Sequence, residues 1–470
     1  MFRQMVCLVV IVAVCVAGSL RPSYAFTIGE EREIGEKLLY QVRQAFPIVG
    51  DPDLHQYLNG LGQEVLEVAG LQFFDYRFFI VESKQFNAFA APSGLIFFYT
   101  ELISSMNSED ELVSVIAHEI GHVVKRHLAS RMKKGTIVNI ATLGAALAAI
   151  ALGGGGAASQ ALLAGSLAAG QSAQLYFSRE DEKEADLLAY NWLKELNRNP
   201  EGQKAMLQTM RRITRYRMGQ VPQYLLTHPD PEARLDYVES LMSAEGLGGD
   251  KTPAQKERDF SFLRFKYRIM TQIKDNRSVR AYLGNKLQDQ GSSSFARNMA
   301  RYGLAQLDFR ENNYDQALDK LNHVISALPE KQILFIDKAV ILASQGEFEQ
   351  ARIMLDEAYR RHPQDMYAAY QLAHVSERLG DLESAERLLR QVAFAMPEFS
   401  KVYFDLGRIL SARGETAQSR FFLGKFNLYE GKLKLAEENF REARSAPGIS
   451  ASLRTECEEL LALIERLQKG

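Results

Sequence analysis

The C-terminal part of the chain repeats its apolar and polar positions with a period of 34 residues. Three kinds of residue keep this period: a small alanine, a glycine or asparagine, and a proline. They are Ala317, Ala351 and Ala385; Asn312, Gly346, Gly380 and Gly414; and Pro329, Pro363 and Pro397. Alanine lets two helices approach closely, glycine or asparagine ends one helix, and proline stops the next. The pattern predicts stacked helix pairs that bury a continuous core and expose a concave surface.

The pattern changes on the N-terminal side of these repeats. Residues 26–106 mix helical and strand-like periods, whereas residues 108–243 are mostly helical. Residues 244–259 are rich in Gly, Lys and Asp and indicate a linker, and residues 260–470 carry the helical repeats. We therefore expect a mainly α-helical protein with a small β-sheet, in which an α+β domain over residues 26–243 precedes an all-α solenoid.

A secretory signal is indicated at the start of the sequence. Arg3 precedes an apolar run from Met5 to Gly18, which is short for a membrane span. Ser23-Tyr24-Ala25 is a small-x-small cleavage site, so we interpret residues 1–25 as a cleavable signal peptide. A membrane anchor that stays attached is the alternative. Cys457 is then the sole cysteine of the mature chain, which excludes an intrachain disulfide.

Residues 135–178 contain no formally charged side chain. The tetraglycine Gly153–Gly156 divides this segment into two halves rich in Ala and Leu, and neither half predicts a strong spanning helix. Two interpretations stay open: a mobile hydrophobic loop or helical hairpin over the active-site face, where it could contact a membrane surface, and a helical pair buried in the domain core.

A pair of histidines lies within "SEDELVSVIAHEIGHVVKRH", which predicts one helix from Ser108 to His127. His118 and His122 are four residues apart, so they share a face of that helix, as two imidazole ligands of one Zn²⁺ require. Glu119 adjoins the first histidine and can act on water near the metal without binding the metal itself. A pair of solvated surface histidines is the plain alternative.

A third ligand is expected on the next helix, "SREDEKEADLLAYNWLKEL", which begins at Ser178. Glu182 and Asp186 share one face, beside alanines that permit close packing of helices. One of these carboxylates could bind the metal while the other accepts the free N–H of a ligating histidine. We interpret three neighbouring acids of this helix as solvated: Glu180, Asp181 and Glu184.

Together these motifs resemble a family of zinc metallopeptidases that includes the CAAX prenyl endopeptidases and the mitochondrial protease OMA. The resemblance implies one Zn²⁺ per chain, held by His118, His122 and Glu182, with Glu119 as the catalytic base and Asp186 in a supporting catalytic role. The C-terminal repeats resemble the tetratricopeptide repeat. The expected fold is therefore a zincin-like metallopeptidase domain followed by a tetratricopeptide solenoid.

The segment "NAFAAPSGLIFFYTELI" is similar to the strand that precedes the metal helix in this family. Within it, the β-prone run of Leu95, Ile96, Phe97, Phe98 and Tyr99 follows a glycine. We expect this run to be an edge strand, to which a peptide substrate could add as a further strand. An ordinary core strand is the alternative.

One more histidine, His228, lies between Thr227 and Pro229 in "YLLTHPDPEARLDYV". The resemblance implies that it can occupy the fourth metal position as a plug, and that Arg234 orients that loop or the substrate. A structural role at a helix entry is the alternative for His228. His127 is five residues after His122, so we expect it to face away from the metal and to support the helix C-terminus.

The function that follows is a zinc-dependent endopeptidase whose repeats recruit polypeptides. Resemblance to secreted family members with such repeats implies the periplasm, quality control of misassembled outer-membrane proteins, and the outer-membrane barrel assembly machinery as a partner. A chaperone or adaptor with a mostly plugged protease site is the second hypothesis, and a membrane-tethered quality-control protease is the third. The formal net charge of −2 gives no indication of nucleic-acid binding.

Overall fold

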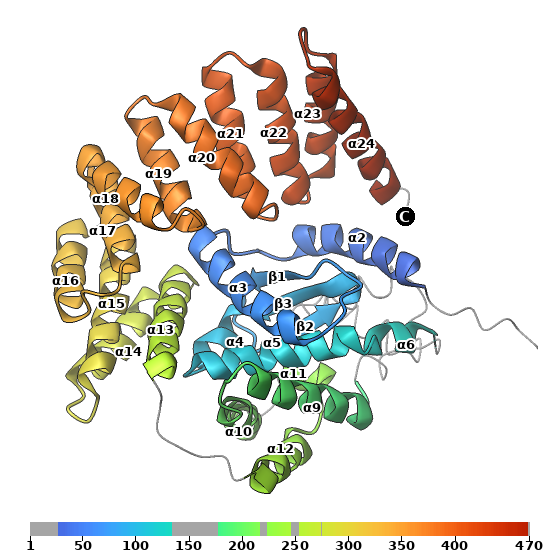
Figure 1. The fold of residues 1–470 in the computed structure, drawn as a ribbon, viewed down its shortest axis with the longest axis vertical. Helices are drawn as coiled ribbons and strands as arrows, with labels where there is room; N and C mark the ends of the chain where they lie inside the picture. Colours follow the sequence, from blue (N-terminus) through green and yellow to red (C-terminus); the bar gives the residue numbers. More distant parts are fainter. Residues whose placement is uncertain (1–26, 134–176, 217–222, 246–252, 274, 469–470) are drawn as a thin grey trace, which may run out of the picture.

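The computed structural model describes residues 27–133, 177–216, 223–245, 253–273 and 275–468. The predicted signal peptide and all but the last two residues of the uncharged segment 135–178 lie outside the described residues. Within the described residues, no helix has the length and apolar character needed to cross a membrane. The fold is mainly helical with one small sheet, as the sequence predicts (Figure 1).

A three-stranded sheet with strand order β1-β3-β2 forms the centre of the N-terminal part. β1 (Arg77–Val81) pairs parallel with β3 (Leu95–Tyr99), and β2 (Ala88–Ala91) pairs antiparallel with β3. The tight 3-10 turn η1 (Pro92–Gly94) joins β2 to β3, and two residues of this turn have positive φ. β3 is buried along its whole length.

The position of β3 corrects the expectation of an edge strand at Leu95–Tyr99. Both backbone edges of β3 are paired, so no further strand can add to it. Side chains of its five residues alternate between two apolar cores: Ile96 and Phe98 face one, and Phe97 and Tyr99 face the other. A run that is apolar at every position is typical of a strand buried on both faces, which is the alternative stated above.

Helices cover both faces of the sheet (Figure 1). α2 (Ile28–Ala45), which begins with a capping box at Thr27, packs on the Phe97 face. α3 (Pro52–Val68) and α5 (Glu109–Val124) pack on the Phe98 face. The remaining helices of this part are α4 (Thr100–Ser105), α6 (His127–Lys133), α9 (Arg179–Glu195), α10 (Glu201–Tyr216), α11 (Gln223–Thr227) and α12 (Pro231–Glu245).

The C-terminal helices form the predicted solenoid. Gly346, Gly380 and Gly414 have φ of 96°, 86° and 78°, and each lies just after a helix, as the repeat pattern predicts. The helices are α14 (Asn276–Gln288), α15 (Ser294–Arg310), α16 (Tyr314–Ala327), α17 (Ile333–Gln345), α18 (Phe348–Arg361), α19 (Met366–Arg378), α20 (Leu382–Ala395), α21 (Ser400–Ala412), α22 (Thr416–Tyr429), α23 (Leu433–Ser445) and α24 (Ala451–Gln468).

α13 (Pro253–Ile273) joins the two parts of the molecule. It begins inside residues 244–259, so the last seven residues of the predicted linker are helical. Phe262 and Phe265 belong to the core of the N-terminal part, whereas Phe260 and Tyr267 belong to the core of the first repeats. Both cores therefore depend on the same helix.

A buried cluster of charges fixes α13 between its neighbours. Arg264 contacts Asp53 of α3 and Asp337 of α17, each at 2.8 Å. Arg268 contacts Asp337 at 3.1 Å and also Asp51 at 2.9 Å, the residue that caps α3. Burial raises the pKa of Asp337, but the two guanidinium groups outweigh it and hold this pKa below its usual value. The solenoid thereby curves over α2 and α3, with α19 against α3 (Figure 1).

Replacing Asp337 should destabilise the whole molecule. In Asp337→Ala, two buried guanidinium groups lose a shared partner, which we expect to lower the free energy of unfolding by about 3–5 kcal/mol. The stabilisation from Asp337 is present above the ordinary Asp pKa and is lost on acidification through the folded-state pKa. Denaturant unfolding at neutral and acidic pH measures both effects. Asp319→Ala, which removes an exposed carboxylate on α16, should change stability by less than about 0.5 kcal/mol.

Candidate metal centre

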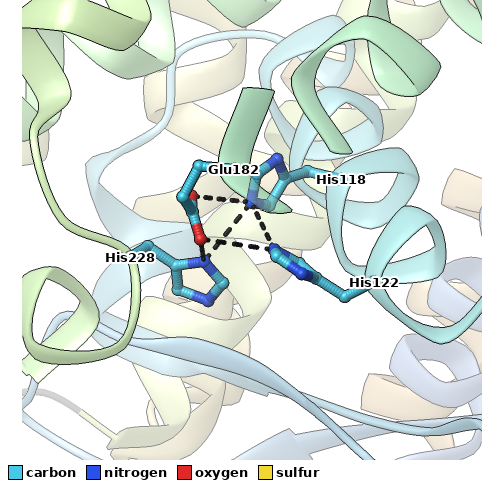
Figure 2. Close-up of side chains that lie close together, drawn as sticks. All are labelled: His118, His122, Glu182 and His228. Carbon is cyan, nitrogen blue, oxygen red and sulfur yellow. Dashed lines mark hydrogen bonds and ion pairs between the residues drawn. The ribbon is translucent and has the colours of Figure 1, made fainter. Parts of the chain in front are cut away.

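Two histidines project from the C-terminal half of α5 into the interior. Ser108 caps this helix by accepting a hydrogen bond from the Glu111 amide, and the helix runs without a break to Val124. His118 and His122 lie one turn apart, and their Nε2 atoms are 3.1 Å apart (Figure 2). Both residues are 2% exposed, which excludes the alternative of solvated surface histidines.

α9 brings carboxylates to the same place. It begins with a capping box between Ser178 and Asp181, and it packs closely on α5. A Cβ on Gly121 would lie 3.3 Å from the Ala185 Cα, so the small residues at this crossing allow the two helices to approach. Glu182 and Asp186, on either side of Ala185, consequently face the two histidines.

The segment after α11 supplies a third histidine. His228 is fully buried, and its backbone N–H donates to the Tyr224 carbonyl at 2.7 Å, which holds it at the end of that short helix. The Tyr224 ring stacks on the imidazole with centroids 4.4 Å apart. His228 Nδ1 lies 3.0 Å from Glu182 Oε1 and 3.3 Å from His118 Nε2 (Figure 2).

The four side chains fit a single tetrahedral metal ion. Each of His118, His122, Glu182 and His228 offers one ligand atom, and all four atoms lie within 4.8 Å of one another. Contacts between ligand atoms of different residues range from 3.0 to 3.5 Å. Ligands about 2.1 Å from a Zn²⁺ would be about 3.4 Å apart, the edge of a regular tetrahedron. Three nitrogens and one carboxylate oxygen also match the donors that zinc prefers.

Unpartnered polar atoms surround the same point. Both carboxylate oxygens of Glu119 and the Nε2 atom of His228 are buried, and none has a hydrogen-bond partner among the described residues. Glu119 Oε1 lies 3.4 Å from that His228 nitrogen. Leaving such groups buried without partners costs about 1–3 kcal/mol each, so their concentration here supports a bound ion and water.

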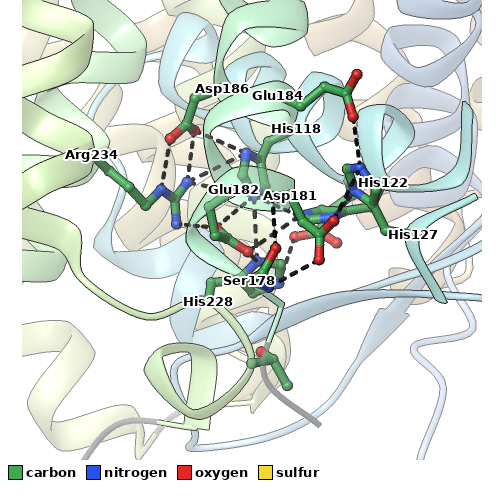
Figure 3. A network of polar contacts seen from close by, with 12 residues as sticks. His118, His122, His127, Ser178, Asp181, Glu182, Glu184, Asp186, His228 and Arg234 are labelled. Carbon is green, nitrogen blue, oxygen red and sulfur yellow. Dashed lines mark hydrogen bonds and ion pairs between the residues drawn. The ribbon is translucent and has the colours of Figure 1, made fainter. Parts of the chain in front are cut away.

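Arg234 compensates the buried carboxylates (Figure 3). Its Nε and Nη2 atoms donate to the two oxygens of Asp186, each at 2.8 Å, and its Nη1 lies 2.8 Å from Glu182. Asp186 also contacts His118 Nδ1 at 3.0 Å, the geometry in which it accepts the free N–H of a ligating imidazole. These contacts connect α12, which carries Arg234, to α9.

Burial and neighbouring charges shift the pKa values of the candidate ligands in different directions. Burial raises the pKa of Glu182, but His228 and Arg234 outweigh it and hold the pKa well below the usual range. Burial holds the pKa of His122 well below its usual value, so this ring is neutral. Burial and Arg234 lower the pKa of His118, but Asp186 and Glu182 outweigh them and raise it to about 9. Metal binding must therefore release a proton from His118 near neutral pH.

The position of His127 differs from the expectation. α5 ends before it, and Arg126 takes φ of 53°, so the chain turns and His127 begins α6. Its Nδ1 atom lies 2.8 Å from Nδ1 of His122, on the side of that ring away from the metal point (Figure 3). His127 therefore faces the candidate ligand and does not point away from it. The expectation was wrong because it continued one helix through residues 124–127.

The contact between Glu184 and His127 was not predicted from the sequence. The Glu184 carboxylate lies 3.1 Å from His127 Nε2 and 2.6 Å from Lys125 Nζ, and the side chain of Glu184 is 45% exposed. The hydrogen bonds from Lys125 and His127 hold the pKa of Glu184 below its usual value. Its spacing of two residues from Glu182 turns its side chain away from the metal face of α9, and the turn at Arg126 brings His127 to it.

Comparison with known proteins identifies the N-terminal part. Residues 52–242 match the model of peptidase family M48, and residues 302–365 and 342–403 match models of the tetratricopeptide repeat. The chain carries a peptidase family M48 domain. The metal-dependence of this family agrees with the four-residue cluster in the M48 domain.

Several proteases are similar to this chain in sequence. The beta-barrel assembly-enhancing protease of Escherichia coli (strain K12) is 29% identical over 309 residues, which cover 64% of this chain and 61% of that protein. The protein of the same name from Yersinia pestis is 28% identical over 378 residues, covering 79% and 75%. The mitochondrial metalloendopeptidase OMA1 of Schizosaccharomyces pombe is 27% identical over 186 residues, covering 40% of this chain and 52% of that protein.

Metal binding should stabilise the M48 domain. A ligand that binds only the folded state adds about 2.7 kcal/mol at a free concentration of 100 times its dissociation constant. Zn²⁺ added to chelator-treated protein should therefore raise the melting temperature, and the affinity should weaken as the pH falls because His118 must release its proton. Calorimetry across a pH series measures both. A His118→Ala/His122→Ala variant should show no shift; an equal shift in that variant would place the metal elsewhere.

Proposed function

We propose that this chain is a zinc-dependent endopeptidase that acts on misassembled polypeptides in the periplasm. The observation that carries the proposal is the position of Glu119: its buried carboxylate, free of hydrogen bonds among the described residues, lies beside the tetrahedral set of His118, His122 and Glu182. The M48 domain and the protease relatives support this reaction class. The proposed location in the periplasm rests on the interpretation of residues 1–25 as a signal peptide.

Each side chain of the set has a distinct part in hydrolysis. A bound Zn²⁺ supplies Lewis acidity, which acidifies water and polarises a peptide carbonyl. Glu119 accepts the proton of the attacking water and passes it to the leaving amine. Asp186 holds the Nδ1 proton of His118 and so keeps the Nε2 lone pair directed at the metal point. Arg234 keeps Glu182 and Asp186 ionised in a buried setting.

The substrate is proposed to lie along β2. Among the residues that the structure describes, β2 pairs with β3 on one edge only, and it packs against α5, the helix that carries Glu119. An extended peptide that adds to the outer edge of β2 would run beside α5 and bring a backbone carbonyl toward the metal point. Recognition through backbone hydrogen bonds suits an enzyme whose substrates are unfolded chains of varied sequence.

The solenoid is proposed to recruit clients or assembly machinery for outer-membrane barrel proteins. The names of the E. coli and Yersinia pestis relatives support this partner class. Part of the concave surface is filled by α2 and α3 of the same chain, so partners would bind the remaining exposed faces of the repeats (Figure 1). Contact between residues 135–178 and a membrane surface stays a prediction, because all but the last two of these residues lie outside the described residues.

One observation favours a second function, that of a chaperone or adaptor with a plugged protease site. His228 Nδ1 occupies the fourth corner of the ligand set, where an attacking water would otherwise bind. With His228 in place the site is closed, and the repeats could still bind polypeptides. Activation would then require the segment between α11 and α12 to move.

Glu119→Gln tests the proposed reaction. The amide keeps the size of the side chain but cannot accept a proton, so cleavage of an unfolded protein substrate should fall by about 10²–10⁴-fold. Zinc content, measured by atomic emission, should stay at one ion per chain. Wild-type cleavage in this variant would refute the role of Glu119. If Glu119→Gln instead restores normal growth to a strain that lacks this protein, the chaperone function is favoured.

His228→Ala tests the plug. Removing the imidazole opens the fourth position, so cleavage of an unfolded substrate or of the chain itself should increase over that of the wild type. The matched control combines His228→Ala with Glu119→Gln, which should abolish the gain. An unchanged or lower rate in His228→Ala with zinc retained would show that His228 has a structural role only.

A further inference from the structure

The turn between α5 and α6 directs three successive basic side chains to carboxylates. Lys125 Nζ contacts Glu184 at 2.6 Å, and Arg126 donates to Glu31 of α2 through Nε and Nη2 at 3.0 and 2.9 Å. His127 Nε2 lies 3.1 Å from Glu184. Arg126 has the left-handed conformation that interrupts the helix between α5 and α6, and its ion pair with buried Glu31 holds it there.

Ligand chemistry fixes the protons along this path. For His122 Nε2 to bind a metal, the neutral ring must carry its proton on Nδ1. That proton is donated to Nδ1 of His127, 2.8 Å away, which must therefore be unprotonated. The proton of His127 is then on Nε2, where it is donated to the Glu184 carboxylate. The tautomer of His122 therefore determines the tautomer of His127, along a path that leads from the metal point to the half-exposed Glu184 (Figure 3).

The geometry points to His127 and Glu184 as positioning residues for the metal site: we propose that they fix the tautomer and the orientation of His122. His118 has a carboxylate, Asp186, in direct contact with its Nδ1 atom. His122 reaches its carboxylate through one intervening imidazole. Because hydrogen bonds to a ligating histidine raise its basicity and restrain its ring, loss of this path should weaken metal binding. This inference rests on the proposed function, because it assumes that His122 is a metal ligand.

The decisive comparison uses two substitutions at one position. His127→Leu removes the acceptor for His122 Nδ1–H and should weaken zinc binding by about 10–100-fold, measured by competition with a chromophoric chelator. His127→Gln keeps a carbonyl acceptor toward His122 and an amide donor toward Glu184, so it should restore affinity to within a few-fold of wild type. Absorption of the Co²⁺-substituted protein should shift in His127→Leu and return toward wild type in His127→Gln.

A second pair of variants keeps the test valid if His127→Leu fails to fold. Glu184→Ala changes a half-exposed side chain, and it should weaken zinc binding by less than His127→Leu but by more than its control. The matched control is Glu180→Ala, which removes an exposed acid about one helical turn closer to the start of α9. The melting temperature of the metal-free proteins separates metal positioning from general destabilisation. A purely structural role would lower the melting temperature of the metal-free and the zinc-bound protein by the same amount.

The outcomes separate this inference from the proposed function. Wild-type protein that binds no zinc would overturn the proposed function and the inference together. If the wild type binds zinc and cleaves substrate, then zinc affinities of His127→Leu and Glu184→Ala within twofold of wild type, with unchanged Co²⁺ spectra, would overturn the inference alone. Weakened binding in His127→Leu that His127→Gln rescues would support it.

Discussion

The metal centre depends on a close contact between two helices. α5 carries both histidines and α9 carries both carboxylates, so the set exists only if the two helices lie close together. Gly121 and Ala185 meet at the crossing, where a larger side chain at either position would separate the helices. A shift of even 1 Å would take Glu182 out of reach of the point that the histidines define.

That close contact buries several ionisable groups together. The guanidinium group of Arg234 compensates the negative charge of the buried carboxylates. His118, Glu182 and Asp186 are almost fully buried, and Arg234 lies between the two carboxylates. Desolvation opposes every charge in such a set, and only specific partners make the charged forms stable. Arg234 comes from α12, the helix that follows the segment holding His228.

Regular spacing explains what could be predicted from the sequence. The 34-residue period gave the solenoid, because helix ends at Gly346 and Gly380 follow directly from the conformational freedom of glycine. The four-residue spacings placed His118 with His122 and Glu182 with Asp186, because helix geometry converts that spacing into a shared face. These features depend on local rules that hold wherever a helix forms.

Features set by tertiary contacts escaped prediction. The pairing of Leu95–Tyr99 on both edges depends on which strands lie beside it, and an all-apolar run does not reveal that. His127 was misplaced because one residue, Arg126, leaves the helical conformation, held by an ion pair with Glu31 that is 95 positions away. Long-range partners of this kind have no signature in the spacing of a single sequence.

The sharing of α13 between two cores bears on how this protein can be divided. A boundary drawn from the repeat pattern near residue 260 would remove Phe262, Phe265 and Ile269 from the core that supports α3 and α5. A shortened chain that ends there would expose that core to water. The repeats alone would keep the core around Phe260 and Tyr267 but would expose Phe262 and Phe265 on the other side of the helix. The peptidase and the solenoid are therefore separate in sequence but not in folding. A chimera that replaces either part would have to keep α13 and the residues of both cores that contact it.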